Sequence, residues 1–233
     1  MSESVSMLAP IYEHPWDISP QEAIAIQREL AQRIDPKDYH DQIESVAGID
    51  VGIKGGVARA AVAVLSFPAL ELIAISRVEC KVSFPYVPGL LTFREGPVIL
   101  QALAKLAVVP DVLMFDGQGY AHPRRMGIAT HMGILLDHPS LGCAKSRLCG
   151  THDDPGPERG SRAWLWDGEE IVGAVVRTRT NVRPVFVSVG HKMSLETAID
   201  LVLRCGRRYR LPEPTRQAHQ AASSMGSISI GNC

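Results

Sequence analysis

The sequence has no excess of charge of either sign, and its cysteines are few. Its 24 Lys and Arg residues balance 25 Asp and Glu residues, which gives a net charge of −1. No general basic field therefore indicates a nucleic-acid partner, although a local basic patch on a neutral protein would suffice. The five cysteines are odd in number and form no C-x-x-C pair. This usage fits a cytoplasmic protein with free thiols better than a secreted disulfide framework.

Long apolar runs and several common motifs are also absent. No stretch reaches about 18 uninterrupted apolar residues, so we expect no membrane span. The first residues lack a basic region followed by an apolar run, so we expect no signal peptide. The patterns G-x-x-x-x-G-K-[ST], H-E-x-x-H and G-x-S-x-G do not occur. A P-loop nucleotide site, a zinc protease and a serine hydrolase are therefore unsupported.

The length and the pattern of elements predict one α/β domain over residues 1–233. No internal repeat and no second domain is visible. Residues 221–233 are small and polar, and we expect them to form a disordered tail. The predicted elements are a helix at 18–34 capped by Ser19, strands at 46–53, 57–66 and 70–80, a helix at 90–108, a strand at 111–116, a helix from Pro123 to Leu136, strands at 140–144, 161–167, 171–177 and 185–189, and a helix from Ser194.

Three acidic residues occupy positions where a carboxylate is costly. Asp50 interrupts the apolar run from Val46 to Ile53, Asp116 ends another apolar run, and Glu95 lies near the start of an otherwise apolar helix. Each acid alone would be interpreted as a surface carboxylate or a helix cap. A carboxylate pulled partly out of water needs a partner, and a divalent cation is the strongest one available. The three acids therefore predict a Mg²⁺ site and metal-dependent phosphodiester chemistry.

The order of the predicted elements resembles the ribonuclease-H-like fold, an α/β fold with a mixed central sheet flanked by helices. Three antiparallel strands precede a helix, a strand, a second helix and another strand. That fold places acids on its first strand, its first main helix and its fourth strand. Asp50, Glu95 and Asp116 fall on those elements in that order.

Two glycines follow Asp116 in the stretch Gly117-Gln-Gly119. They follow a strand and precede a helix, as in a dinucleotide fingerprint, but the third glycine is missing. Asp116 would also place a negative charge beside a pyrophosphate, so we reject a dinucleotide site. The glycines more plausibly let backbone amides approach a ligand closely, as in a pocket for a flat base.

The stretch Phe84-Pro-Tyr-Val-Pro-Gly89 has two interpretations. One is a stiff connector whose aromatic side chains pack into the core. The other is a wedge, in which two prolines hold a loop rigid so that Tyr86 enters a base stack in place of an extruded base. Among the basic residues, Lys145 follows a buried strand directly and is well placed to meet a phosphate. The arginines between residues 204 and 210 are interpreted as a solvated face.

Taken together, these motifs resemble those of the endonuclease V family, the deoxyinosine-specific 3′ endonucleases, over about residues 15–220. The motifs that carry the resemblance are Gly48-Ile-Asp50, the stretch from Phe84 to Pro97, the stretch from Phe115 to Gly127, Ala144-Lys-Ser-Arg147 and Pro214-Thr-Arg-Gln-Ala-His219. The resemblance implies that three acids bind the catalytic Mg²⁺, with Mn²⁺ as a substitute: Asp50, Glu95 and Asp116.

The resemblance also implies roles for the residues around these acids. His219 would lie near the metal-bound water, and Lys145 near the scissile phosphate. The strand-separating wedge would consist of Pro85, Tyr86, Val87 and Pro88. The pocket for the flipped hypoxanthine would be lined by Gly89, Leu91, Gly117, Gly119 and Ile128.

The implied activity is Mg²⁺-dependent cleavage of DNA one nucleotide 3′ of deoxyinosine, leaving a 3′ hydroxyl and a 5′ phosphate. One alternative is an endoribonuclease that acts on inosine-containing single-stranded RNA, because the sequence does not show contacts to a 2′ hydroxyl. Another is a catalytically silent protein that binds damaged or branched DNA by shape, against which the retention of all three acids argues. A monomer is the expected oligomeric state.

Overall fold

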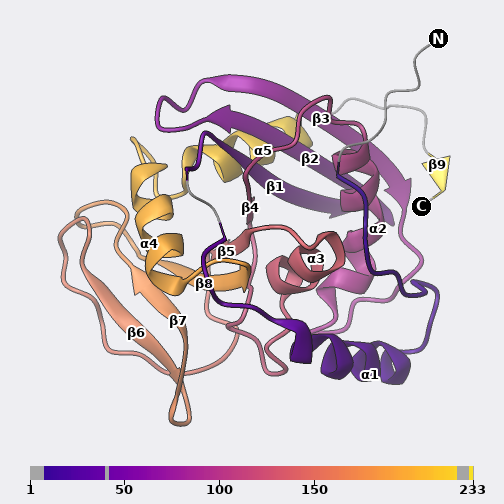
Figure 1. The fold of residues 1–233 in the computed structure, drawn as a ribbon, viewed down its shortest axis with the longest axis horizontal. Coiled ribbons are helices and arrows are strands. Elements are labelled where there is room, and N and C mark those ends of the chain that lie inside the picture. Colours follow the sequence, from indigo (N-terminus) through magenta and orange to yellow (C-terminus); the bar gives the residue numbers. More distant parts are fainter. Residues whose placement is uncertain (1–7, 40–41, 225–230, 233) are drawn as a thin grey trace.

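The structure is a computed structural model that describes residues 8–39, 42–224 and 231–232. A nine-stranded mixed sheet runs in the order β6-β7-β8-β5-β4-β1-β2-β3-β9, with helices on both of its faces (Figure 1). In chain order the elements are α1 (Pro20–Leu30), η1 (Ala31–Arg33), β1 (Ser45–Lys54), β2 (Val57–Ser66), β3 (Leu72–Lys81), α2 (Leu91–Ala104), β4 (Val112–Phe115), α3 (Ile128–Leu136), β5 (Ser140–Ala144), β6 (Arg162–Asp167), β7 (Glu170–Val176), β8 (Val185–His191), α4 (Leu195–Arg204), α5 (Glu213–Ser223) and β9 (Gly231–Asn232).

The centre of the sheet joins an antiparallel meander to parallel strands. β1, β2 and β3 pair in antiparallel fashion, and the turn between β1 and β2 uses Gly55 and Gly56 at φ +60° and +75°, where glycine is favoured. β4 lies parallel to β1, and β5 lies parallel to β4. This arrangement confirms the expected ribonuclease-H-like layout of the strands.

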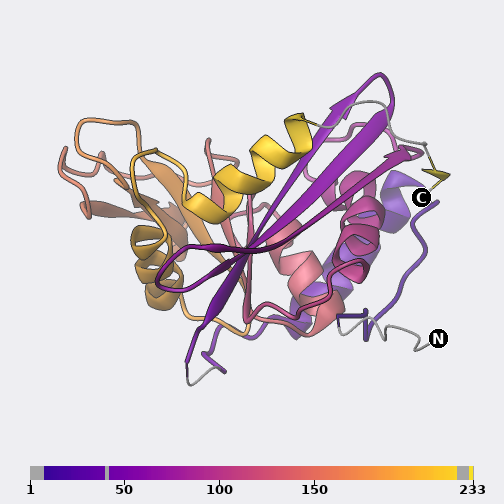
Figure 2. The same cartoon turned by 90° about the horizontal axis from the view of Figure 1, so that it is seen from above.

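Side chains of the central strands alternate between two hydrophobic layers. Leu113 and Phe115 of β4 pack in the layer that contains α2 and α3. Val112 and Met114 point the other way, into the layer that contains α4 and α5. Figure 2 shows α5 on one face of the β1–β3 meander and α2 on the opposite face. The ends of the central strands are therefore enclosed by helices from both sides.

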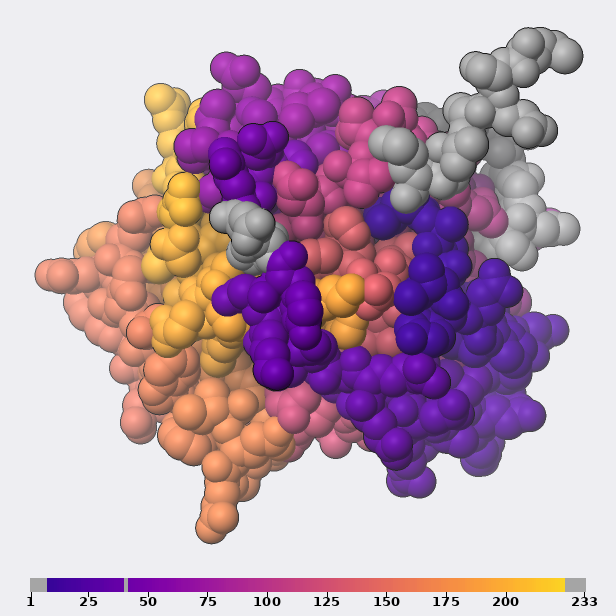
Figure 3. Space-filling view, viewed as in Figure 1, coloured from indigo at the N-terminus to yellow at the C-terminus, as the bar shows by residue number. Residues whose placement is uncertain are grey.

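The N-terminal segment lies across the front of the molecule in the view of Figure 3. The amide of Ile11 donates to the carbonyl of Leu135 (2.8 Å), and the amide of Lys192 donates to the carbonyl of Asp35 (2.6 Å). Between these attachments, α1 begins with the expected cap, in which Ser19 and Glu22 form a capping box. The segment therefore holds α1 against the loops that precede α2 and α3.

Most predicted elements are confirmed, but three boundaries are wrong. The helix expected at 90–108 ends at Ala104. The helix expected from Pro123 begins only at Ile128, because the preceding residues form a loop in which Arg125 has φ +58°. The tail expected from Ala221 also begins too early. α5 continues to Ser223, and Ala221 and Ala222 are buried at 3% and 4% exposure. Residues 225–230 and 233 lie outside the described part of the chain.

The cysteines follow the expectation only in part. Cys143, Cys149 and Cys205 are free, and burial raises the pKa of the Cys143 and Cys205 thiols. Cys80 departs from the expectation, because it is disulfide-bonded; it lies on β3 where that strand pairs with β9. Among the described residues, no helix is long and apolar enough to cross a membrane.

Candidate active site

Two of the predicted acids meet at neighbouring strands in the middle of the sheet. Asp50 follows Ile49 on β1, and Asp116 follows Phe115 at the end of β4. Because β1 and β4 are parallel with Ile49 opposite Phe115, the amide of Asp116 donates to the carbonyl of Ile49 (2.9 Å). The two carboxylates therefore lie side by side. They are largely shielded from water, with side-chain exposures of 11% for Asp50 and 7% for Asp116.

α5 brings a histidine to this pair of acids. His219 Nδ1 lies 3.1 Å from Asp50 Oδ2. The helix reaches β1 because Gly48 has no side chain: a Cβ at this position would lie 1.9 Å from the carbonyl carbon of Pro214. The direct contact between the start of α5 and β1 thus sets the position of the imidazole.

The donor atoms of this cluster suit a divalent cation. Asp50, Asp116 and His219 each offer a ligand atom within 4.8 Å of the others. Carboxylate oxygens are the ligands that Mg²⁺ prefers, and imidazole is common for several other divalent metals. A metal is therefore compatible with the residues present, and the cluster differs from the predicted ligand set in containing His219.

Glu95, the third predicted ligand, lies outside this group but interacts with it electrostatically. Burial and then the negative charge of Asp50 raise the pKa of Glu95 to about 8. Burial, a hydrogen bond from the protonated Asp50 carboxyl to Asp116 and the negative charge of Asp116 raise the pKa of Asp50 to about 6. Negative charge is thus concentrated here beyond what the protein compensates, and a bound cation would favour the ionised carboxylates.

Lys145 lies where the sequence predicted a contact to phosphate. It follows β5, and its ammonium group forms an ion pair with Asp116 while the side chain stays 43% exposed. Asp50, Lys145 and His219 line an open groove of about 460 Å³, which is also lined by Lys54 and Arg59. The cations and the opening to solvent allow a phosphate to approach the acids.

A smaller cavity of about 140 Å³ lies between the start of α2 and the loop before α3, and one of its walls is Gln118, two residues after Asp116. It is smaller than the roughly 300–1,000 Å³ of pockets for drug-sized ligands, so it suits a single flat group. Most of the predicted wedge and three of the predicted pocket residues line it. These are Tyr86, Val87, Pro88, Gly89, Leu91 and Ile128. Tyr86 is 71% exposed, so it is free to contact a bound strand rather than packed in the core.

Three predicted residues do not line this cavity: Pro85, Gly117 and Gly119. At the two glycines, close packing of neighbouring atoms leaves no room for a side chain. A Cβ on Gly119 would lie 2.1 Å from the carbonyl oxygen of Val189 on β8, and one on Gly117 would lie 2.7 Å from Ile128 Cγ2. The role of both glycines at a base stays a prediction, and their lack of a side chain has this packing reason as well.

Sequence reasoning missed several residues of the cavity, including His122 and Gln118. Burial and then the charge of Arg124 lower the pKa of His122 to about 4, so its ring is neutral at pH 7. Its Nδ1 accepts the amide of Arg124 (3.1 Å), which leaves Nε2–H to donate to the carbonyl of Gly89 (3.0 Å). Gln118 Nε2 donates to the carbonyl of Ser146 (2.8 Å). Both side chains follow Asp116 closely in sequence, and this proximity was the available signal.

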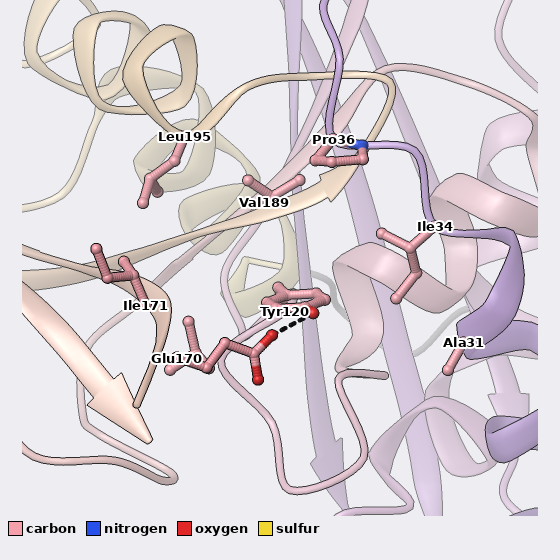
Figure 4. Close-up of a pocket in the computed structure, with 9 residues that line it drawn as sticks. Ala31, Ile34, Pro36, Tyr120, Glu170, Ile171, Val189 and Leu195 are labelled. Atoms are coloured by element: carbon pink, nitrogen blue, oxygen red, sulfur yellow. Dashed lines mark hydrogen bonds between the residues drawn. The ribbon is translucent and has the colours of Figure 1, made fainter. Parts of the chain in front are cut away.

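The loop before α3 is also fixed from the side of β7. Arg125 pairs with Asp167 and Glu170, and Tyr120 donates to Glu170 Oε1 (2.5 Å). Figure 4 shows Tyr120 and Glu170 at a separate cavity of about 380 Å³, which is otherwise mostly apolar. Neither Asp50 nor Asp116 lines that cavity, so we do not assign metal-dependent chemistry to it.

Comparison with known proteins agrees with this geometry. A family model described as Endonuclease V matches residues 28–220. The Endonuclease V of Roseiflexus sp. (strain RS-1) is 53% identical over 212 residues, which are 91% of this chain and 96% of that protein. The crystal structure of Endonuclease V from Streptomyces avermitilis has a TM-score of 0.85 at 41% identity, covering 89% of this chain and 93% of that one.

A further similar structure contains nucleic acid. It is Ciona intestinalis Endonuclease V in complex with a 23mer DNA containing an inosine followed by a ribo-adenosine, with a TM-score of 0.77 at 29% identity. The match covers 88% of this chain and 97% of that one. The region matched by the family model includes every residue of the acid cluster and of the small cavity.

Proposed function

Because the chain belongs to the endonuclease V family of nucleases, we propose that it is a Mg²⁺-dependent DNA repair endonuclease specific for deoxyinosine. It would cleave one nucleotide 3′ of the lesion and leave a 3′ hydroxyl and a 5′ phosphate. The observation that carries the proposal is the juxtaposition of a cluster of acids and a base-sized cavity with an exposed tyrosine beside it. The similar Ciona protein, with its inosine-containing DNA, supports the choice of substrate.

The mechanism assigns one task to each part of the site. Asp50, Asp116 and His219 would hold the metal, with Glu95 beside them. A metal bound there supplies Lewis-acid stabilisation of the phosphate and lowers the pKa of water. The positive charge of Lys145 lies near the phosphate and stabilises the negative charge that increases there in the transition state.

Recognition would depend on the cavity and its neighbouring loop. Tyr86 fills the gap that an extruded base leaves in the stack, and the neutral walls of the cavity enclose the base. Opening a weakened base pair costs less than opening a normal one, which favours a deaminated base.

The direct test is a nicking assay on matched DNA and RNA duplexes that contain one inosine, with Mg²⁺ or with EDTA. We expect metal-dependent nicking one nucleotide 3′ of deoxyinosine. Cleavage of the RNA alone would indicate that the same site processes inosine-containing RNA. Binding of either duplex without cleavage would contradict the proposed activity.

Replacing Tyr86 with alanine is expected to weaken discrimination for inosine far more than it affects folding. The side chain is 71% exposed, so its loss removes little buried surface. Stacking on a base contributes about 1–3 kcal/mol, which corresponds to roughly a tenfold loss of selectivity or more. Rates of nicking at inosine and at adenine in the same duplex give the ratio. Tyr209→Ala, at a position 52% exposed, is the matched control; equal selectivity in both variants would refute the wedge.

Replacing Lys145 with methionine should slow cleavage about 100-fold while changing DNA affinity much less. The ammonium lies at the acid cluster, where it contacts Asp116, and its charge matters most when phosphate charge increases. Single-turnover nicking rates and anisotropy with labelled DNA separate the two effects. Lys105→Met, at the exposed end of α2, should keep the parent rate. A parent rate in Lys145→Met would exclude this role.

A further inference from the structure

Gln27 is a buried polar residue on α1 that belongs neither to the acid cluster nor to the walls of the small cavity. It is 0% exposed, although α1 is otherwise largely a surface helix. Its Nε2 donates to the carbonyls of Gly89 (3.1 Å) and Met126 (3.1 Å), and its Oε1 accepts from Arg124 Nε (2.6 Å). Every hydrogen bond of this buried amide therefore goes to two loops that are distant in sequence.

These two loops both contribute walls of the cavity. Gly89 ends the segment that follows Tyr86, whereas Met126 lies in the loop before α3, and both residues line the cavity. Gly89 has φ +79° and no side chain with which to pack. Its carbonyl also accepts from His122 Nε2 (3.0 Å) and from an Arg124 amino group (2.8 Å). Hydrogen bonds to this carbonyl thus help to fix where this wall lies, beside the packing of Val87 and Leu90.

We propose that Gln27 is a positioning residue that sets the separation of the two walls and thereby the selectivity of the cavity for the flipped base. Gln27 does not line the cavity; it acts through Gly89 and Met126. The inference rests on the proposed function of the site. Loss of the amide would leave the carbonyl of Met126 and the Nε of Arg124 without this buried partner, so the loops would rearrange to regain hydrogen bonds.

The experiment compares DNA affinities in the full-length Asp116→Asn variant, which is expected not to cut its substrate. Gln27→Met is added because methionine keeps the length of the side chain and removes the amide. Anisotropy gives the dissociation constants for two duplexes that differ only in inosine or adenine at one position. We expect the preference for inosine to fall about tenfold or more, with less than about a twofold change in affinity for the adenine duplex.

Leu30→Ala in the same background controls for a general loss of stability in α1. Leu30 is buried in the core and forms no side-chain hydrogen bond to either loop. It should lower the melting temperature and keep the preference for inosine. An unchanged preference in Gln27→Met, or an equal loss in Leu30→Ala, would overturn the positioning role. The Asp116→Asn protein with no further substitution should itself prefer the inosine duplex. If it bound both duplexes equally well, the proposed function would be contradicted, and the inference with it.

Discussion

Replacing Asp116 with asparagine is expected to reduce strand cleavage by about 1,000-fold or more and to leave DNA binding intact. Asparagine has nearly the same shape, so the backbone hydrogen bond between Asp116 and Ile49 is preserved. The negative charge, however, is lost from the centre of the cluster, where Asp116 lies beside Asp50 and pairs with Lys145. A cation would then have one anionic ligand fewer. In the proposed function, binding depends on the groove and on the small cavity, and Asp116 lines neither of them.

Single-turnover nicking across a Mg²⁺ titration measures this effect, and anisotropy with the inosine duplex measures binding. Asp200→Asn is the matched control, because Asp200 is exposed on α4 and pairs only with the neighbouring Arg204 among the described residues. It should retain the parent rate. Undiminished cleavage by Asp116→Asn would refute the assignment of the acids.

The metal-free protein is expected to lose stability as the pH rises from about 4.5 to about 8. The ordinary pKa of glutamate is 4.5, and that of Glu95 in the folded state is about 8. Within this window the folded protein keeps a proton that the unfolded chain has released. The free energy of unfolding therefore falls by about 1.4 kcal/mol per pH unit from this group. Asp50, with a folded pKa of about 6, adds a decrease at the lower end of the window.

Glu95→Gln isolates this contribution, because the amide cannot ionise and occupies nearly the same volume. In EDTA at pH 8.5 the variant should melt several degrees above the parent, given about 2–4 °C per kcal/mol for a chain of this size. Near pH 5 the difference should become small. Saturating Mg²⁺ should raise the melting temperature of the parent more than that of the variant. A parallel pH dependence of the two proteins in EDTA would show that Glu95 is not destabilised by its surroundings.

The sequence allowed the acids to be identified because a carboxylate within an apolar strand is rare enough to be informative. Asp50 and Asp116 lie on the predicted strands, and Glu95 lies on the predicted helix. The approach of His219 depends on the contact between α5 and β1, which spacing along the chain does not encode. A histidine near the metal site was expected only from the resemblance to the endonuclease V family.

The walls of the cavity could be predicted only in part. The segment around Tyr86 was identified by its prolines and aromatic residues, whereas the role of Gln27 depends on bonds to residues 62 and 99 positions away. Gly119 was assigned to a ligand because close backbone approach requires glycine. The close approach of Val189 on β8 also requires glycine there. Composition and periodicity cannot distinguish an approach to a ligand from an approach to a strand.

The late position of α5 in the chain has a consequence for protein synthesis. The cavity, its neighbouring tyrosine, both central carboxylates and Lys145 all lie before residue 150, whereas His219 is among the last described side chains. Because a chain is made from its N-terminus, the parts proposed to recognise a base are made well before the site has all of its proposed ligands. A chain that stops before α5 lacks the imidazole and leaves apolar residues of β2 such as Ala61 uncovered. We therefore expect the chain to become competent for cleavage only when the last helix has been made.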